Sequence, residues 1–437
     1  MTNHFIDMKN TDCAFIIGSN TAENHPMSFK WLTEAREKRG AKIINVDPRF
    51  TRTSARSDIY APLRSGTDIA FIGGMMNYIL ENKLYHEEYL RWFTNATFIV
   101  ADSYDFNDGL FSGYDPTKRK YDKTQWAFKK TEDGQYEKDM TMEDPRCVLQ
   151  LMKKHYARYD IDTVCKITGT PKNKFLEVAK AYAATGAPDK VGTILYAMGT
   201  TQHTVGTENV RSYAMLQLLL GNIGRAGGGV NALRGESNVQ ASTDWALLFH
   251  LIPGYINSPE AQKHPDYATF LAKETPKTGF KVNTPKWVAS LLKSYWMDDD
   301  PEKSYHYLPK RIDGKQYAHI ALFEAMYNKE IEGLFIWGSN PIVGGPNANK
   351  EQAALANLKW MVAIDLWQTE TSEFWSYKAM DRPTDNDVYK IKRPEEIDTE
   401  VFFLPACSSY EKDGSISNSG RWMQYRWKAV DPVGESK

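Results

Sequence analysis

Cysteine is scarce in this sequence, and its pattern indicates no metal or cluster site. The 437-residue chain has four cysteines, Cys13, Cys147, Cys165 and Cys407. None belongs to a Cys-x-x-Cys pair, and none has histidines at the spacing of a zinc finger. We interpret them as scattered buried thiols, and we expect no metal ligand among these residues.

The chain also has no excess of charge of either sign. Lys+Arg total 54 and Asp+Glu total 55, which gives a formal net charge of −1. A nearly neutral chain lacks the electrostatic attraction of a general binder of nucleic acid or anionic membranes. We therefore expect no nucleic-acid partner.

Long hydrophobic runs are missing as well. The longest apolar stretches, such as residues 215–220, are far shorter than the roughly 20 residues that span a bilayer. Residues 1–5 show neither the basic nor the apolar region of a signal peptide. Taken literally, the sequence indicates a cytoplasmic chain without direct membrane insertion.

Several enzyme signatures are absent too. The sequence has no serine nucleophile elbow, no His-Glu-x-x-His and no P-loop, which disfavours a hydrolase. What it does have is 42% hydrophobic and 13% aromatic residues over a length that suggests two or three globular domains.

The N-terminal part predicts a βαβ unit. Residues 13–17 form a short apolar run that ends at Gly18-Ser19-Asn20, as a buried strand before a turn would. A helix is expected over residues 27–39, followed by a second buried strand over 42–46 that ends at Asp47. Such units build parallel sheets with right-handed crossovers.

The same pattern returns near the end of the chain. An apolar run over residues 333–337 precedes Gly338-Ser339-Asn340, and a second run over 360–364 ends in Asp365. Both aspartates begin the same spaced string: Asp47, Thr51, Thr53, Ser54 and Asp365, Thr369, Thr371, Ser372. The sequence therefore predicts two related βαβ units.

This repeat divides the chain into two expected α/β domains, residues 1–236 and 237–437. Residues 102–144 are polar, aromatic and rich in turns, and we interpret them as a surface insertion in the first domain. Further α/β structure is expected from a strand over 193–197 and a helix over 208–220. Residues 298–316 form a second polar excursion.

The repeated turns predict a pair of nucleotide sites. In a parallel sheet, ligands bind beyond the carboxyl ends of the strands, where both Gly-Ser-Asn turns fall. Backbone N–H groups at a helix start favour a phosphate, and an acid after the next strand can accept hydrogen bonds from a ribose or a guanine. The turns are not Gly-x-Gly-x-x-Gly, so a nicotinamide cofactor is disfavoured.

Two other segments are candidates for ligand contact. Gly227, Gly228 and Gly229 precede Arg234, and glycines let backbone approach a bulky ligand closely. Arginine is a bidentate receptor for a carboxylate or phosphate, which we favour for Arg234 over a surface or structural ion pair. Residues 198–203 follow a strand and could be either a ligand contact or an ordinary polar turn.

Together these motifs resemble the molybdopterin oxidoreductases, and most closely the catalytic subunits of formate dehydrogenases. The resemblance rests on residues 18–26 (GSNTAENHP), 46–53 (VDPRFTRT) and 227–235 (GGGVNALRG), and continues through 411–415 and 418–422. It implies two Rossmann-like parallel-sheet domains of the DMSO reductase type. It also implies a bis(molybdopterin guanine dinucleotide) cofactor that carries molybdenum or tungsten.

The resemblance also implies roles for individual residues. One dinucleotide would be held by Gly18, Ser19, Asn20, Glu23, Asp47, Arg49, Thr51, Gly66 and Asp68. The other would be held by Gly338, Asn340, Asp365 and Lys412, and the pterins would lie along Met198, Gly199 and Gln202. Arg234 matches the family's active-site arginine, which orients formate.

The implied reaction is the oxidation of formate to CO2, with electrons passed to an iron–sulfur subunit and onward to a cytochrome. The family's 4Fe–4S domain, its selenocysteine or cysteine metal ligand and its C-terminal barrel have no counterpart here. We therefore expect this chain to be inactive alone, as a fragment of a selenoprotein. The resemblance favours the periplasm.

Two alternatives remain open. A non-catalytic structural relative would keep the fold and lose the pterin, and the presence of Arg234, Gln202 and both aspartates argues against it. A same-cofactor enzyme with another substrate, such as a nitrate reductase, is disfavoured by the string Asn231-Ala232-Leu233-Arg234-Gly235.

Overall fold

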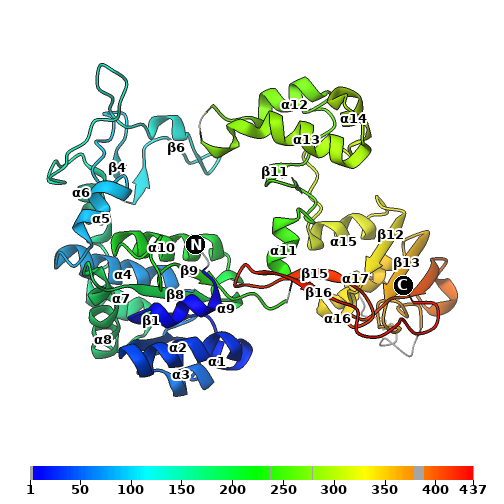
Figure 1. Cartoon of the computed structure of the whole chain (residues 1–437), viewed down its shortest axis with the longest axis horizontal. Helices are drawn as coiled ribbons and strands as arrows, with labels where there is room; N and C mark the ends of the chain where they lie inside the picture. Colours follow the sequence, from blue (N-terminus) through cyan, green and yellow to red (C-terminus); the bar gives the residue numbers. More distant parts are fainter. Residues whose placement is uncertain (1–2, 108, 237, 278, 377–387, 437) are drawn as a thin grey trace. The chain divides into compact units, whose positions relative to one another are not determined.

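The computed structural model describes residues 3–107, 109–236, 238–277, 279–376 and 388–436. Met1, Ser237 and Lys437, which bound the two predicted domains, lie outside the described residues. The chain forms two compact units (Figure 1). The first unit contains Met1–Val239 and Ser417–Trp422, and the second contains Gln240–Ile416 and Met423–Lys437. The return of Ser417–Trp422 to the first unit was not anticipated by a single cut near residue 236.

The first unit is built on a five-stranded parallel sheet with the strand order β3-β2-β1-β8-β9. The bounds are β1 Cys13–Ile17, β2 Lys42–Val46, β3 Ile59–Ala61, β8 Gly192–Tyr196 and β9 Val230–Ala232. Short, continuous apolar runs are typical of parallel strands because both faces of such a sheet are covered. The α/β class predicted from the sequence is confirmed.

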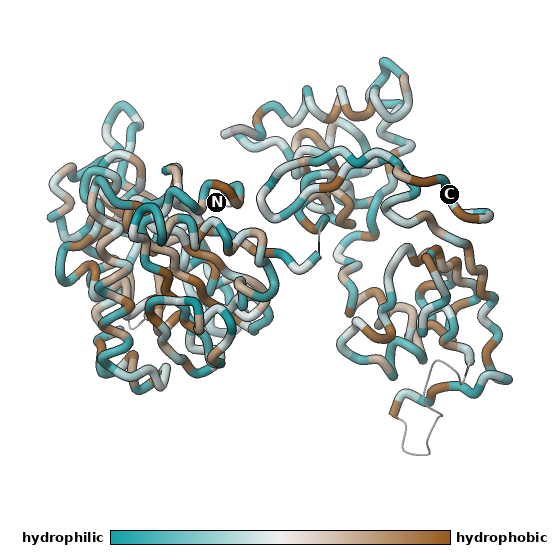
Figure 2. Tube along the Cα trace, turned by 60° about the horizontal axis from the view of Figure 1, so that its bottom comes forward, coloured by the Kyte–Doolittle hydropathy of each residue, from teal (hydrophilic) through white to brown (hydrophobic). Residues whose placement is uncertain are grey.

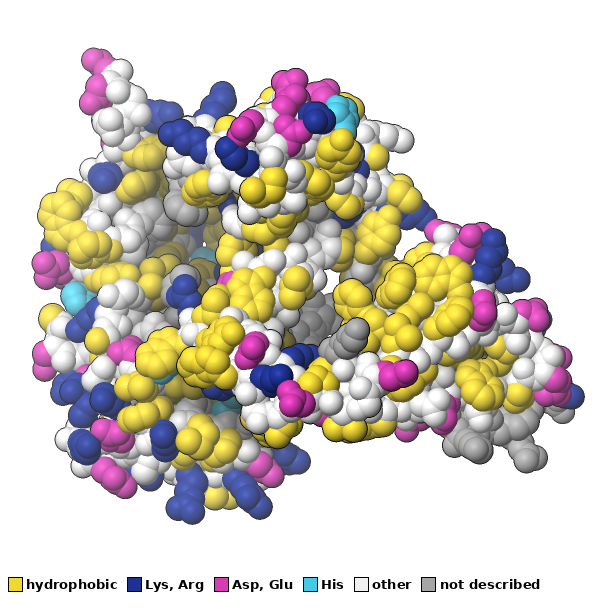
Figure 3. Space-filling model, turned by 45° about the vertical axis from the view of Figure 1, so that its right-hand side comes forward, with side chains coloured by type: hydrophobic (Ala, Val, Ile, Leu, Met, Phe, Trp, Pro, Cys, Tyr) yellow, Lys and Arg dark blue, Asp and Glu magenta, His cyan; other side chains and the backbone are white. Residues whose placement is uncertain are grey.

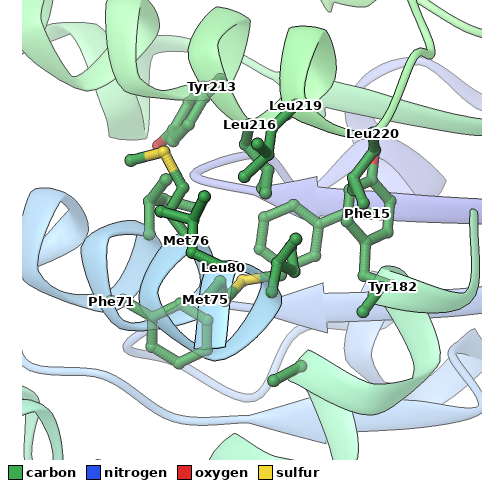
Figure 4. Packing of buried hydrophobic residues seen from close by; sticks show 14 of the residues in the cluster. Phe15, Phe71, Met75, Met76, Leu80, Tyr182, Tyr213, Leu216, Leu219 and Leu220 are labelled. Carbon is green, nitrogen blue, oxygen red and sulfur yellow. The ribbon is translucent and has the colours of Figure 1, made fainter. Parts of the chain in front are cut away.

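Helices cover both faces of this sheet. On one face, Phe29 and Leu32 of α2 (Pro26–Arg39) pack against Ala14 and Ile16 of β1. On the other face, α4 (Asp68–Glu81), α8 (Lys172–Ala183) and α10 (Gly206–Leu219) enclose the larger core, whose packing is shown in Figure 4. The remaining helices are α1 Thr21–Asn24, α3 Arg52–Arg56, α5 Glu87–Phe93, α6 Val148–Tyr156, α7 Ile161–Thr168 and α9 Met198–Thr201.

The predicted insertion over residues 102–144 contains two short hairpins. Their strands are β4 Phe106–Asn107, β5 Leu110–Phe111, β6 Tyr114–Asp115 and β7 Lys120–Tyr121. Aromatic side chains hold the insertion together: the ring centroid of Phe111 lies 5.5 Å from that of Trp126.

The second unit contains a parallel sheet of three strands, in the order β12-β13-β14. The bounds are β12 Gly333–Trp337, β13 Trp360–Asp365 and β14 Glu400–Pro405. The core under one face comes largely from α15 (His319–Tyr327) and α17 (Ala348–Leu355). Strand, helix and parallel strand therefore recur as the repeat predicts.

A smaller helical cluster completes the second unit. Phe270 and Tyr305 are fully buried among α12 (Tyr267–Glu274), α13 (Thr284–Trp296) and α14 (Pro301–Tyr307). The segment expected as a polar excursion thus contains a packed helix. The other elements are α11 Val239–Asp244, β10 Leu251–Ile252, β11 Ile256–Asn257, α16 Pro341–Gly344, β15 Gly414–Ser417 and β16 Met423–Arg426.

Hydrophobic segments run through the interior of each unit, and polar segments lie mainly at the periphery (Figure 2). In the part of the chain that the structure describes, no helix combines the length and the apolar character needed to cross a bilayer.

Candidate functional site

A cavity of about 440 Å³ opens beyond the carboxyl ends of β1, β2 and β8 in the first unit. Eight of the residues predicted to bind cofactor line it: Gly18, Ser19, Asn20, Asp47, Arg49, Thr51, Met198 and Gly199. The other lining residues are Asn24, His25, Ala197, Leu233 and Gly235, which the sequence analysis did not assign to the site. Residues from four separate parts of the chain therefore meet at the edge where ligands bind to parallel sheets.

Two glycines bring the turns after β1 and β8 into contact. Gly18 has a φ of +60°, and a Cβ atom there would lie 2.5 Å from the backbone nitrogen of Thr200. A Cβ atom on Gly199 would lie 2.7 Å from the carbonyl oxygen of Gly18. Any side chain at either position would push the two turns apart, so glycine is required for this wall of the cavity.

The side chain of Asn20 is held in place by hydrogen bonds from Thr53 of α3, the helix that follows β2. Its Oδ1 accepts from the backbone nitrogen of Thr53 at 3.2 Å and from Thr53 Oγ1 at 3.0 Å. Its Nδ2 donates to Oε2 of Glu23 at 2.7 Å, and the backbone nitrogen of Ala22 donates to Thr53 Oγ1. Glu23 thus acts on the cavity through Asn20 rather than lining it.

Asp47 follows β2 and supplies a carboxylate to the cavity. Its Oδ1 accepts from the backbone nitrogen of Arg49 at 2.9 Å. Burial raises the pKa of Asp47, and the hydrogen bond from Arg49 and the Arg49 charge oppose that shift. A half-buried carboxylate with free acceptor capacity is suited to bind the hydroxyl or amine donors of a ligand.

Asp68, Gly66 and Gln202 do not line the cavity. The hydroxyl of Tyr213 donates to Asp68 Oδ1 at 3.4 Å and lies 3.0 Å from Thr200 Oγ1, so Asp68 is linked to the turn after β8. Burial raises the pKa of the Asp68 carboxyl. Gly66 has a φ of +82°, and Gln202 is exposed at the end of α9. Cofactor contact by these three residues remains a prediction.

The backbone of Arg234 is fixed from two sides. Its nitrogen donates to Ser419 Oγ at 2.8 Å, and its carbonyl oxygen lies 2.8 Å from Nε2 of His25. Its neighbours Leu233 and Gly235 line the cavity. Burial raises the pKa of Tyr196, and the charge of Arg234 opposes that shift. The guanidinium therefore belongs to a residue anchored at the cavity wall.

The second unit has its own cavity, of about 450 Å³, at the carboxyl ends of β12 and β13. It contains the predicted residues Gly338, Asn340 and Asp365. The other lining residues are Ser339, Trp367, Gln368, Thr369, Glu370 and Glu373. Lys412 is exposed and does not line this cavity, and its contact with a cofactor remains a prediction.

Three hydrogen bonds around the second cavity repeat hydrogen bonds of the first. Oδ1 of Asn340 accepts from the backbone nitrogen of Thr371 at 3.2 Å and from its Oγ1 at 2.7 Å. The backbone nitrogen of Ile342 donates to Thr371 Oγ1 at 3.2 Å. Equivalent hydrogen bonds therefore orient the side-chain amides of Asn340 and Asn20.

The two cavities differ in charge. Nδ2 of Asn340 donates to Oε2 of Glu370 at 2.6 Å, whereas Asn20 uses Glu23 for the same purpose. Counted from the repeated aspartate, Glu370 stands where the first unit has Arg52, and Trp367 stands where it has Arg49. The first cavity thus has a cationic rim, and the second has an indole and carboxylates.

The repeat itself could have identified more of the second site. Ser339 and Thr369 stand at the positions of Ser19 and Thr51, and Trp367 follows Asp365 as Arg49 follows Asp47. No comparable signal points to Gln368 or Glu373. Within the residues that the structure describes, no three His, Cys, Asp or Glu side chains form a group that could hold a metal ion.

Comparison with known proteins places these features in one family. The family model described as molybdopterin oxidoreductase matches residues 1–374. The chain is 52% identical over 438 residues to "Formate dehydrogenase subunit alpha" of Megalodesulfovibrio gigas, covering 99% of this chain and 42% of that protein. It is 50% identical to "Formate dehydrogenase 2 subunit alpha (cytochrome c-553)" of Nitratidesulfovibrio vulgaris, covering 99% of this chain and 42% of that protein.

A third relative gives the same result. The chain is 46% identical to "Formate dehydrogenase, nitrate-inducible, major subunit" of Escherichia coli, covering 100% of this chain and 43% of that protein. The chain therefore spans about two fifths of the length of the curated relatives it matches. Among solved structures, acetylene hydratase from Pelobacter acetylenicus shares the fold, with a TM-score of 0.54 and 19% identity over 100% of this chain and 46% of that one.

The match to the family model covers most of the chain, including both Gly-Ser-Asn turns and the glycine-rich segment before Arg234. Membership implies a molybdopterin cofactor with molybdenum or tungsten. The chain belongs to the molybdopterin oxidoreductase family.

Proposed function

We propose that this chain is the part of a formate dehydrogenase catalytic subunit that holds the two nucleotide ends of a bis(molybdopterin guanine dinucleotide) cofactor. The observation that carries the proposal is the pair of cavities, each behind a Gly-Ser-Asn turn and each with the same asparagine–threonine hydrogen bonds. Two cavities of one design are suited to two copies of one group. Relatives at 46–52% identity are named as formate dehydrogenase subunits.

The side chains present are suited to nucleotide groups. Asp47 and Asp365 can each accept two hydrogen bonds, as the N–H groups of a guanine edge or the hydroxyls of a ribose require. The guanidinium of Arg49 at the first cavity can donate a bidentate pair to a phosphate. The backbone contact between Gly18 and Gly199 leaves a wall without side chains, against which a flat ring system can lie.

Formate oxidation gives CO2, one proton and two electrons. The bound cofactor supplies the metal centre that accepts the two electrons. The role of this chain's own residues is to bind and orient. Arg234 provides a planar pair of N–H donors for the formate carboxylate, and its backbone is held by Ser419 and His25. When Arg234 holds the carboxylate of formate, the C–H bond of formate points away from Arg234.

The electrons would continue to an iron–sulfur chain and then to a carrier such as a cytochrome. One relative carries "cytochrome c-553" in its name. Export to the periplasm is part of the same proposal, because the resemblance is to periplasmic enzymes of this kind.

The experiment grafts residues 1–437 into the M. gigas subunit in place of the matching segment. We expect formate-dependent dye reduction and no nitrate reduction. Arg234→Lys should lower kcat/KM by about 100- to 1000-fold while pterin content stays normal, since lysine lacks the planar fork. Arg225→Lys, on the same glycine-rich segment, is the matched control, and its rate should stay within about twofold of the parent. Normal formate turnover by Arg234→Lys would refute the assigned role.

A further inference from the structure

Another cavity of the first unit lies between the insertion over residues 102–144 and helix α6. Its volume is about 330 Å³, and it shares no lining residue with the cavity beyond β1, β2 and β8. Six aromatic rings line this space, which we call the aromatic cavity: Tyr104, Phe106, Phe111, Trp126, Phe128 and Tyr156. The proposed binding of nucleotides and formate uses none of these residues.

The walls of the aromatic cavity come from two parts of the chain that pack against each other. The insertion supplies five of the rings, and α6 supplies Met152, His155 and Tyr156. The ring of Phe106 contacts the imidazole of His155, with centroids 4.9 Å apart, and meets the ring of Phe111 at 5.6 Å. These contacts join the insertion to α6 and hold the rings around the cavity.

The aromatic cavity differs from ordinary apolar surface. Hydrophobic side chains reach the surface at many places on both units (Figure 3), and single exposed apolar side chains are normal in folded proteins. None of the six rings is exposed: Phe106 and Tyr156 are buried, and the other four are half-buried. Asn95 is exposed and also lines the cavity, so one end of the cavity borders solvent.

One buried polar atom of the lining lacks a partner. Nδ1 of His155 is buried and forms no hydrogen bond within the part of the chain that the structure describes. Two other polar groups of the lining are already used. Trp126 Nε1 donates to the carbonyl oxygen of Ser112 at 2.9 Å. The hydroxyl of Tyr156 donates to Met215 Sδ at 3.9 Å. Burial lowers the pKa of His155, so its ring is neutral near pH 7.

We propose that the aromatic cavity binds a small molecule with two fused aromatic rings and one hydroxyl group, of which 2-naphthol is a simple example. An apolar cavity of about 150 Å³ accepts a single benzene ring, so about 330 Å³ accommodates two fused rings. The surrounding rings favour an aromatic occupant, because aromatic pairs attract in edge-to-face and offset arrangements. Small-molecule sites are typically concave and mainly apolar, with a few polar groups that fix orientation.

A hydroxyl is the polar group that suits His155. A neutral imidazole nitrogen is a donor or an acceptor according to its tautomer, and a hydroxyl can be either. Water fits less well, because a buried water needs two to four polar partners. Among the described lining residues, Nδ1 of His155 is the one buried side-chain atom without a partner. The proposal does not depend on formate oxidation, because the nucleotide cavities and the aromatic cavity have no residue in common.

The test titrates 2-naphthol and naphthalene into the 437-residue chain and into the M. gigas subunit that carries residues 1–437, with isothermal titration calorimetry as the readout. We expect a Kd of about 10 μM for 2-naphthol in both proteins, which is within the range for a ligand of this size. Naphthalene should bind about 10-fold more weakly, because it leaves Nδ1 of His155 without a partner.

Three variants locate the site. His155→Leu should remove the preference for 2-naphthol and change the affinity for naphthalene by less than about twofold. Met152→Trp should weaken the binding of both compounds at least about 30-fold, because the larger side chain fills the cavity. His306→Leu, at an exposed histidine of the second unit, is the matched control and should bind both compounds as the parent does. Unchanged amide hydrogen exchange in β1 verifies that the variants fold.

Five outcomes would overturn the proposal. 2-Naphthol binds the chain with a Kd above about 1 mM; the two compounds bind the parent equally; His155→Leu keeps the preference for 2-naphthol; Met152→Trp binds as well as the parent; or the chain binds 2-naphthol and the grafted subunit does not. The last outcome would show that other polypeptide of the subunit fills the cavity.

Discussion

The two units carry almost the same polar site on sheets that are covered very differently. Asn20 and Asn340 make equivalent hydrogen bonds to Thr53 and Thr371, although the first sheet is buried on both faces and the second exposes one. The polar site depends on residues about 30 positions apart, 33 in the first unit and 31 in the second. The cover of the sheet depends on distant elements, such as Tyr182 over Phe15. A binding turn can therefore form wherever its own βαβ unit folds, whereas the core requires the rest of the domain.

The largest expected difference between the units concerns the sheet face itself. Phe15→Ala should destabilise the first unit by about 3–5 kcal/mol, because it leaves a cavity in a packed core. Phe335→Ala should cost the second unit about 0.5 kcal/mol or less, because Phe335 is 60% exposed. Amide hydrogen exchange measured separately for the two units gives both free energies. Equal losses would mean that the second sheet is also covered in solution.

The glycine turns offer a second contrast. Gly18→Ala should cost about 3 kcal/mol, because the new Cβ combines a left-handed φ with a 2.5 Å approach to the backbone of Thr200. Gly338→Ala should destabilise the second unit by only about 1 kcal/mol. The left-handed φ disfavours alanine there, but no atom lies within 4 Å of the new Cβ. Exchange kinetics of β1 and β12 amides report the two values. A larger loss at Gly338 than at Gly18 would contradict the close approach of the first turn.

The threonines should behave alike. Thr53 and Thr371 are both fully buried, and each hydroxyl donates to an asparagine and accepts from a backbone nitrogen. Replacement of either by valine should destabilise its unit by about 1–2 kcal/mol, because buried polar groups lose their partners. Values that differ by more than about 1 kcal/mol between Thr53→Val and Thr371→Val would show that the two networks are not equivalent in energy.

The smallest effect is a pH dependence that Asp68 gives to the stability of the first unit. Burial raises the folded-state pKa of Asp68 above its unfolded value. The stability it contributes is therefore fully present below the ordinary aspartate pKa of about 3.9 and is lost as pH rises through the raised value. Asp68→Asn should be more stable relative to the parent at pH 7 than at pH 3. Denaturation followed at both pH values measures this, and a difference with the opposite sign would contradict it.

The strands and turns of both sites were predictable from the sequence because their signals are local. Short apolar runs end at Gly18 and Gly338, and the matched spacing of Asp47 and Asp365 identified the repeat. The exchange of Glu23 for Glu370 as partner of the asparagine was not predictable, since the two glutamates come from different places in the repeat. Spacing alone says nothing about which side chain turns inward.

Long-range features left no signal in the sequence. The hydrogen bond from Arg234 to Ser419 joins residues 185 positions apart and draws a short segment back to the first unit. The exposure of one face of the second sheet was equally unpredictable, because residues 333–337 have the same apolar pattern as the buried run at 13–17. Burial depends on which helices the rest of the chain supplies.

We propose that each unit holds one nucleotide, and that the repeated asparagine, threonine and aspartate positions form both sites. The direct test is the amount of GMP released by acid hydrolysis, per metal atom, from the M. gigas subunit that carries residues 1–437. We predict about two GMP per metal atom in the parent. Asp47→Asn and Asp365→Asn should each lower the amount of GMP that the subunit retains. One GMP or none in the parent, or full cofactor content in both variants, would contradict the account.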